Sequence, residues 1–229
     1  MGNFLTRAAW ARVLPFVLFM ALLALRGQLM PAEGQPGGAF DARWVYGLSV
    51  LVVTGSLVFF RKEYAELLKG SRPSLWHTVL AIVVGVVVFK LWVSLAEPWM
   101  MLGQPSASFR PVNDEGELMW GLLAVRWIGA ALMVPVMEEL FWRGFLMRWV
   151  DNPNFEQVDP GTVSVKAIAL STLVFMLAHT QWLAAIVAGL AYALLYRYTR
   201  SLWTAVIAHA VTNGILGVWV VVYGNWQFW

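Results

Sequence analysis

The sequence predicts an all-α, polytopic transmembrane helical bundle of about seven spans, and three observations favour this class. Of the 229 residues, 60% are hydrophobic and only 13% are charged, and the mean hydropathy is +0.66. A soluble domain carries about twice that share of charges. Long apolar runs recur along the chain, with no internal repeat, and polar or Pro- and Gly-rich stretches separate them. We therefore expect a single integral membrane domain over residues 1–229.

Seven segments are apolar over lengths that suit membrane helices, and charged or helix-breaking residues bound them. They are 8–25, 44–60, 75–96, 117–150, 165–178, 182–196 and 202–223. The first should remain uncleaved, because no small-residue cleavage site follows it. The fifth and sixth form a short pair that reaches only about 21–23 Å per helix, less than the roughly 30 Å hydrocarbon core. Their shared turn, which begins at His179, should lie inside the membrane and face protein or a wet cavity.

Basic residues are distributed unequally between the two ends of the expected bundle. Those on the N-terminal side are Arg7, Arg12, Arg61, Lys62, Lys69, Arg72, Arg143, Arg148, Lys166, Arg197 and Arg200. Arg26, Arg43 and Arg110 fall on the other side, while Lys90 and Arg126 lie near span ends, from which they can snorkel. The positive-inside rule then places the N-terminus in the cytoplasm and the C-terminus outside. The small net charge of +3 gives no indication of nucleic-acid binding.

The fourth span carries two adjacent carboxylates and an arginine in an otherwise apolar stretch. Ionisable residues inside a membrane helix mark a functional site by default. Glu139 and Arg143 are four residues apart and can pair across one turn, whereas Glu138 points about 100° away. Glu138 is then left without a partner among apolar neighbours, a position that suits a general base. The alternative is that all three residues form one structural ion cluster between helices.

Two histidines share a helix face with a further residue one turn away. Phe175 precedes His179 by four residues, and Asn213 follows His209 by four. Counted from the span ends, these two histidines, Asn213 and Glu138 fall within one slab of the membrane. Unsatisfied polar groups in hydrocarbon cost several kcal/mol each, so we expect the four to line a common wet cavity.

The order and spacing of these motifs resemble a known protease family. The motifs are Glu138-Glu139-x-x-x-Arg143, Phe175-x-x-x-His179 and His209-x-x-x-Asn213. In that order they resemble the CPBP intramembrane proteases, a group named for CAAX processing and bacteriocin processing, over about residues 120–213 with a family core of about 118–223. The Trp142–Leu146 run and the Trp226–Trp229 ending look like the branch associated with exosortase (PEP-CTERM sorting) systems of Gram-negative bacteria. The chain has fewer expected spans than CAAX endopeptidases, so a prenylated substrate does not follow.

The resemblance implies an endopeptidase of the bacterial inner membrane that hydrolyses a peptide bond in a membrane-anchored or C-terminally processed protein. It implies that Glu138 and His179 activate and orient the attacking water, and that His209 and Asn213 stabilise the oxyanion. The supporting residues it implies are Glu139, Arg143 and Phe175. The partners expected are this protein or peptide substrate and the lipid bilayer, with no nucleic acid and no cofactor.

Other chemistries lack their groups in this sequence. There is no Cys, no His-Glu-x-x-His zinc helix and no Gly-x-Ser-x-Gly elbow, and every Asp lies in an expected loop. We expect a metal-independent site, although a zinc ion held by Glu138, His179 and His209 stays open as an alternative. The alternative functional class is a non-proteolytic membrane protein, either an immunity or scaffold protein or a proton-coupled transporter. A transporter favours inverted repeats, and none is visible.

Water and substrate have to reach Glu138 through an opening in the bundle. We expect the cavity to open toward the cytoplasm. A basic rim of Arg148, Lys166, Arg197 and Arg200 at that end could attract a carboxylate or acidic lipid headgroups.

Overall fold

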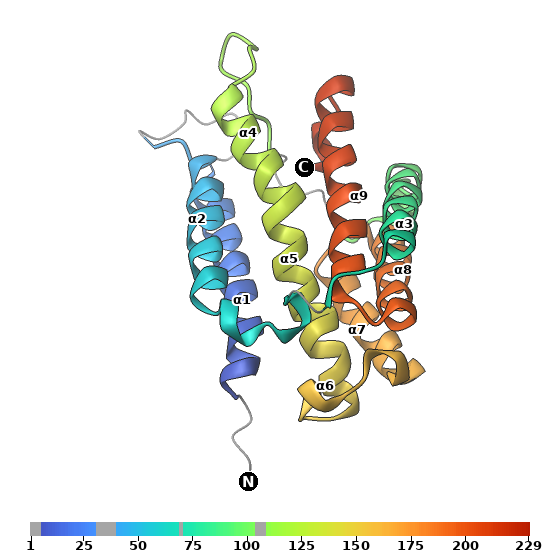
Figure 1. Cartoon of the computed structure of the whole chain (residues 1–229). Coiled ribbons are helices and arrows are strands. Elements are labelled where there is room, and N and C mark those ends of the chain that lie inside the picture. The colour runs from blue at the N-terminus through green and yellow to red at the C-terminus, as the bar shows by residue number, and fades with distance from the viewer. Residues whose placement is uncertain (1–5, 31–39, 69–70, 104–108) are drawn as a thin grey trace.

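The regular structure of the described chain is helical (Figure 1). The computed structural model describes residues 6–30, 40–68, 71–103 and 109–229. Among these residues, five helices are long and apolar enough to cross a membrane, and two shorter apolar helices accompany them. The predicted helical membrane bundle is thereby confirmed. The loop predicted to be rich in Pro and Gly at 31–38 and the basic residue Lys69 lie outside the described residues.

Each predicted apolar segment corresponds to one helix. These are α1 (Arg7–Leu29), α2 (Trp44–Phe59), α3 (Leu75–Ser94), the central helix (Trp120–Asp151), α7 (Val165–Leu177), α8 (Trp182–Thr199) and α9 (Leu202–Tyr223). The central helix joins α4 (Trp120–Ile128), the π segment η5 (Gly129–Met133), α5 (Val134–Glu139), the π segment η6 (Leu140–Leu146) and α6 (Met147–Asp151). With 13 residues α7 is short, as predicted, but α8 has 18. It is longer than expected because its polar residues 197–199 continue the helix beyond the apolar run.

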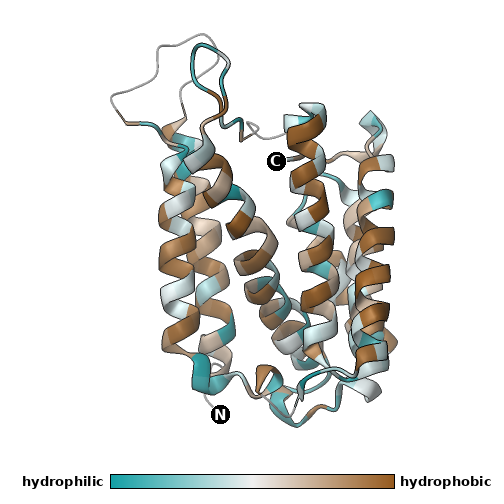
Figure 2. Ribbon diagram, turned by 45° about the horizontal axis from the view of Figure 1, so that its top comes forward, coloured by the Kyte–Doolittle hydropathy of each residue, from teal (hydrophilic) through white to brown (hydrophobic). Residues whose placement is uncertain are grey.

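The central helix divides the bundle. It has 32 residues, about 48 Å at ~1.5 Å per residue, and it crosses the molecule obliquely between the α1–α2 pair and the helices α3, α7 and α8 (Figure 1). The last helix, α9, packs against α3, α8 and the central helix. Figure 2 shows hydrophobic residues along the lengths of the helices, with hydrophilic residues gathered in the loops at both ends and at a few positions within the bundle.

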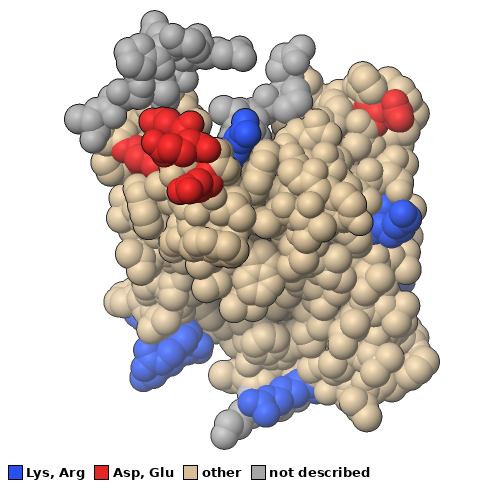
Figure 3. All heavy atoms as spheres, turned by 90° about the horizontal axis from the view of Figure 1, so that it is seen from above, with Lys and Arg blue, Asp and Glu red and all other residues tan. Residues whose placement is uncertain are grey.

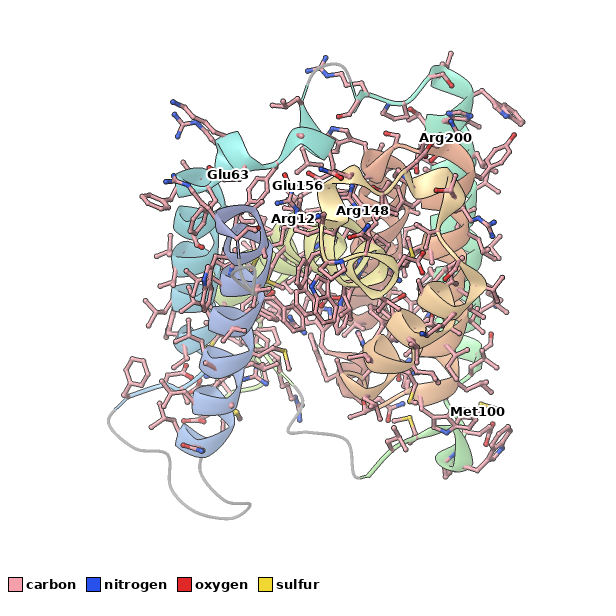
Figure 4. The ribbon with its side chains drawn as sticks, turned by 90° about the horizontal axis from the view of Figure 1, so that it is seen from below. Arg12, Glu63, Met100, Arg148, Glu156 and Arg200 are labelled. Carbon is pink, nitrogen blue, oxygen red and sulfur yellow. The ribbon has the colours of Figure 1, made fainter. Side chains whose placement is uncertain are left out.

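Buried charges join three segments at the end where the N-terminus lies. Glu66, in the short turn η2 (Ala65–Leu67), accepts hydrogen bonds from Arg12 of α1 at 2.6 Å and from Arg148 of α6 at 2.5 Å. Both arginines are buried, and Figure 4 shows them close together at this end of the molecule. The Tyr64 hydroxyl donates to the Ala11 carbonyl at 2.8 Å, and burial raises the pKa of this hydroxyl. Through the segment between α2 and α3, these contacts hold α1 against α6.

A glycine permits the closest approach of α3 to α9. A Cβ added at Gly85 would lie 2.5 Å from the Ala208 carbonyl oxygen and 2.8 Å from Cβ of Val211. The Gly85 carbonyl also accepts a hydrogen bond from Thr212 Oγ1 at 2.9 Å. Helices in membranes pack this closely through small residues. Because α9 carries His209 and Asn213, the contact at Gly85 helps to place both side chains.

We predict that Gly85→Ala destabilises the protein, because the added methyl group pushes α3 away from α9. Overpacking of this kind costs about 1–3 kcal/mol. The matched control is Gly55→Ala in α2, where an added Cβ has no heavy atom within 4 Å. Thermal unfolding of the detergent-solubilised variants, followed by tryptophan fluorescence, measures the difference. Equal apparent melting temperatures for the two variants would contradict the packing argument.

Candidate active site

Four predicted site residues line one cavity inside the bundle. Its volume is about 290 Å³, and its walls come from α1, α2, α3, α7, α8, α9, the central helix, the α7–α8 turn and the C-terminal residues. Glu138, His179, His209 and Asn213 all contribute to the lining. The sequence-based expectation that these residues share one cavity is therefore met in the geometry.

Glu138 faces the cavity from the central helix and is largely buried, with 9% of its surface exposed. Its Oε2 accepts a hydrogen bond from Nε1 of Trp142 at 3.3 Å, one turn further along the helix. The Trp142 ring packs edge-on against Phe16 of α1 and Phe175 of α7. Among the described residues, Glu138 enters no ion pair. The Glu138 carboxylate thus faces the cavity without a cationic partner among these residues, while apolar rings fix Trp142, its hydrogen-bond donor.

Glu139 points into the protein, about 100° away from Glu138, and is completely buried. Its Oε1 accepts from Nη1 of Arg143 at 3.0 Å, which agrees with the expected pair across one turn. The same oxygen accepts from Nδ1 of His209 at 2.9 Å, a contact that the sequence did not predict. Arg143 also donates to the Gly189 carbonyl of α8 at 3.0 Å. The interpretation as a structural ion cluster therefore holds for Glu139 and Arg143, and Glu138 stands apart from it.

Further groups fix the His209 ring from its other sides. Tyr192 of α8 stacks on the ring with a centroid distance of 5.1 Å and an interplanar angle of 20°. The Tyr192 hydroxyl donates to Thr212 Oγ1 at 2.8 Å, one helical turn from His209. With Nδ1 bound to Glu139, only Nε2 remains as a polar atom of His209. Tyr192 and Thr212 were missed from the sequence, although Thr212 lies three residues from His209 on the same helix face.

His179 lies in the turn between α7 and α8, as predicted. Its Nδ1 lies 2.8 Å from the Phe175 carbonyl oxygen, which can only accept, so this nitrogen carries the proton. The Phe175 ring lies 4.3 Å from the imidazole, and the Trp92 ring meets it edge-on at 5.7 Å. Phe175 therefore supports His179 with both its backbone and its ring. Nε2 is left as the polar atom of the imidazole that can meet a water molecule.

Asn213 is held by the first π segment of the central helix. Its Nδ2 donates to the Ala130 carbonyl at 2.9 Å, in η5. An amide nitrogen carries two hydrogens, so one N–H remains for a ligand in the cavity. The arrangement ties α9 to the central helix at the depth of the cavity.

The cavity runs from mid-bundle toward the end opposite the N-terminus. Its far end is formed by Arg26 at the end of α1, Arg126 in α4 and the C-terminal Trp229. The expectation that it opens toward the N-terminal, cytoplasmic end is therefore wrong. The cause is packing, because Phe16 and Trp142 pack together at the N-terminal side of Glu138, while the helices leave space on the other side. Arg126, expected to snorkel outward, faces this space.

The basic rim proposed at the N-terminal end does not reach the cavity either. Arg148 is buried against Glu66 and the Gly144 carbonyl, and its guanidinium is therefore occupied. Arg200 lies on the surface 3.5 Å from Asp159. The cavity lining includes none of the four rim residues, Arg148, Lys166, Arg197 and Arg200.

The described residues include no group of three His, Asp or Glu side chains that could hold a metal ion. Nδ1 of His209 is bound to Glu139, and Nδ1 of His179 is bound to a backbone carbonyl. These contacts leave Nε2 of both rings available, and histidines that bind metals commonly donate their other N–H in this way, so the zinc alternative stays open.

The fold and the site define a polytopic helical membrane protein with a polar cavity and a buried, unpaired carboxylate. Residues 120–215 match the family model described as type II CAAX prenyl endopeptidase Rce1-like, which is a protease family. The matched segment contains every residue predicted for the site, from Glu138 to Asn213. No curated protein and no solved structure matches the chain.

We predict that Glu139→Gln strongly destabilises the protein, because it leaves Arg143 as an uncompensated buried charge. Removing one partner of a buried pair costs about 3–5 kcal/mol. The matched control is Asp159→Asn, which changes a carboxylate to an amide in the exposed pair with Arg200, where a loss of about 0–1 kcal/mol is expected. Thermal unfolding in detergent compares the two variants. A Glu139→Gln variant as stable as the control would show that Glu139 is not the centre of a stabilising cluster.

Proposed function

We propose that this protein is an intramembrane endopeptidase of the CPBP type, which hydrolyses a peptide bond through a water molecule activated by a glutamate. The observation that carries the proposal is the position of Glu138, an unpaired carboxylate that shares one cavity with His179, His209 and Asn213. The match of residues 120–215 to a protease family supports a peptide hydrolase and does not favour the transporter or scaffold alternatives.

In the proposed reaction, a water molecule lies between Glu138 and Nε2 of His179. The Glu138 carboxylate removes a proton from this water as its oxygen attacks the carbonyl carbon of the substrate. Because Nδ1 of His179 donates to the Phe175 carbonyl, the orientation of the imidazole ring is fixed. Its Nε2 therefore keeps one direction. Apolar rings around Trp142 limit the number of water molecules that solvate the carboxylate.

The attack turns the carbonyl oxygen into an oxyanion, which accepts from the free N–H of Asn213 and from Nε2–H of His209. Because Nδ1 of His209 already donates to Glu139, this role requires a ring that is protonated on both nitrogens. Donors of this type each contribute about 2.7–4 kcal/mol to the transition state. Glu139 orients His209 and is a positioning residue in this scheme. The tetrahedral intermediate collapses as the C–N bond breaks, and Glu138 returns its proton to the leaving amine.

We further propose a bacterial inner-membrane location with the N-terminus in the cytoplasm, and a membrane-anchored or C-terminally processed substrate as in the exosortase-associated branch. The excess of Lys and Arg at the N-terminal end supports this orientation. The opposite end carries a cluster of acidic side chains (Figure 3), and the exposed acidic residues of the loop before α4 are Asp114, Glu115 and Glu117. In this orientation the cavity opens away from the cytoplasm, so the substrate enters from the outer side.

We predict that Glu138→Gln lowers turnover of the natural substrate by about 10²–10⁴-fold, the usual contribution of a general base. Comparative proteomics of membrane proteins from cells with wild-type and Glu138→Gln protein identifies the substrate as the protein that accumulates uncleaved. Turnover is then measured with purified enzyme and that substrate. The matched control is Glu156→Gln, at an exposed glutamate outside the cavity, which should cleave at the wild-type rate. Full turnover by Glu138→Gln would refute the base assignment.

We also predict that hydrolysis needs no metal ion, because a carboxylate base can activate the water while two donors, His209 and Asn213, hold the oxyanion. Purified protein treated with EDTA or 1,10-phenanthroline should retain its rate. A loss of activity that zinc restores would contradict this prediction and would favour a zinc-bound site.

A further inference from the structure

Arg126 is placed inside the bundle at the far end of the cavity. It is half-buried, and its guanidinium carbon lies 4.6 Å from the ring centre of Tyr46. The rings of Phe109 and Trp229 each lie 5.6 Å away. Cation–π contacts of this kind stabilise an arginine by about 0.5–2 kcal/mol while leaving its N–H groups unbound. The aromatic rings thus position the guanidinium without satisfying its donors.

The donors of Arg126 are not satisfied by an acidic group of the described chain. Among the described residues no Asp or Glu forms an ion pair with Arg126. Its Nε is buried and makes no hydrogen bond to these residues, and the same is true of the Tyr46 hydroxyl beside it. Both residues line the cavity. Native proteins rarely leave buried polar atoms unsatisfied, and charges inside a membrane protein mark binding sites.

A second arginine adds charge at the same end. Arg26, from the last turn of α1, lines the cavity with Arg126 and lies 5.5 Å from the Phe109 ring that Arg126 also contacts. Two guanidinium groups from separate helices therefore face one region of the cavity. Such a pair attracts an anion, and the planar fork of arginine matches a carboxylate in bidentate geometry.

One strip of the central helix connects this region to Glu138. Arg126, Ala130, Val134 and Glu138 follow one another at intervals of four residues, and all four line the cavity. Ala130 and Val134 have short side chains, which leave room between the charged ends. At ~1.5 Å per residue the strip is about 18 Å long. An extended peptide covers that length with about five residues at ~3.3–3.6 Å each.

We propose that Arg126, with Arg26, forms a carboxylate subsite that holds an acidic group of the substrate about five residues from the bond opposite Glu138. The position of that bond rests on the proposed proteolysis, whereas binding of the carboxylate does not. The carboxylate is either the substrate's C-terminus or the side chain of an acidic residue, since a guanidinium binds both in the same way.

The test measures binding to the Glu138→Gln protein in lipid nanodiscs, where no turnover interferes. The probes are three dansyl-labelled heptapeptides of alternating alanine and leucine: one with a free C-terminal carboxylate, one with a C-terminal amide, and one amide with an internal glutamate. Fluorescence anisotropy gives their dissociation constants. We expect the free acid to bind at least about tenfold more tightly than the plain amide, as charge-assisted hydrogen bonds allow. A second substitution, Arg126→Gln, should remove this preference.

The matched control is Arg110→Gln, at an exposed arginine outside the cavity, which should keep the preference. Tight binding of the glutamate-containing amide identifies a side-chain carboxylate as a ligand, and binding of the free acid alone identifies the C-terminus. Equal affinities, a preference that survives Arg126→Gln, or no binding by any probe would overturn the subsite. A preference for the free acid, combined with a wild-type enzyme that cleaves no substrate, would refute the proposed function and leave the subsite standing.

Discussion

The carboxylate of Glu139 organises the polar interior of a bundle that is otherwise apolar. One of its oxygens accepts from Arg143 on its own helix and from His209 on α9, and Arg143 extends the contacts to the Gly189 carbonyl of α8. A buried charge is costly unless it is paired, so the three ionisable groups require one another. They also fix the rotation of α9 about its axis relative to the central helix, and with it the direction in which Asn213 points.

The two adjacent glutamates have opposite environments because a helix turns by about 100° between them. One oxygen of Glu139 accepts from two protein donors, whereas Glu138 has a single indole donor at 3.3 Å and otherwise faces the cavity. The side chain that pairs with Arg143 is therefore separate from the one that we propose as the general base. A single glutamate bound to Arg143 would be held firmly but would have no lone pair exposed to water.

Much of the fold and part of the site could be predicted from local sequence rules. Hydropathy gives the helices, and spacing of four residues gives the contacts of Glu139 with Arg143 and of His179 with Phe175. Contacts between distant segments could not be predicted. The bond from His209 to Glu139 depends on how α9 packs on the central helix.

The direction of the cavity was also hidden from the sequence. It depends on the packing of Phe16 of α1 against Trp142, which closes the N-terminal side, and on the position of the C-terminal residues at the other side. Arg126 illustrates the same limit. Its distance from the span end predicted snorkelling, but the rings of Tyr46, Phe109 and Trp229, all remote in sequence, hold it inward. Rules that count residues along one helix cannot include partners from elsewhere in the chain.

The π segment η5 between Arg126 and Glu138 changes the directions in which these two side chains leave the central helix. In an unbroken α-helix, residues twelve positions apart differ in azimuth by about 120°, so the two side chains would face different neighbours. A π turn contains more residues per turn and rotates each of them less. The segment Gly129–Met133 thus compensates part of the angular drift, and both side chains reach the same cavity. A local widening of the backbone thereby sets the alignment of two charged groups that are more than three turns apart.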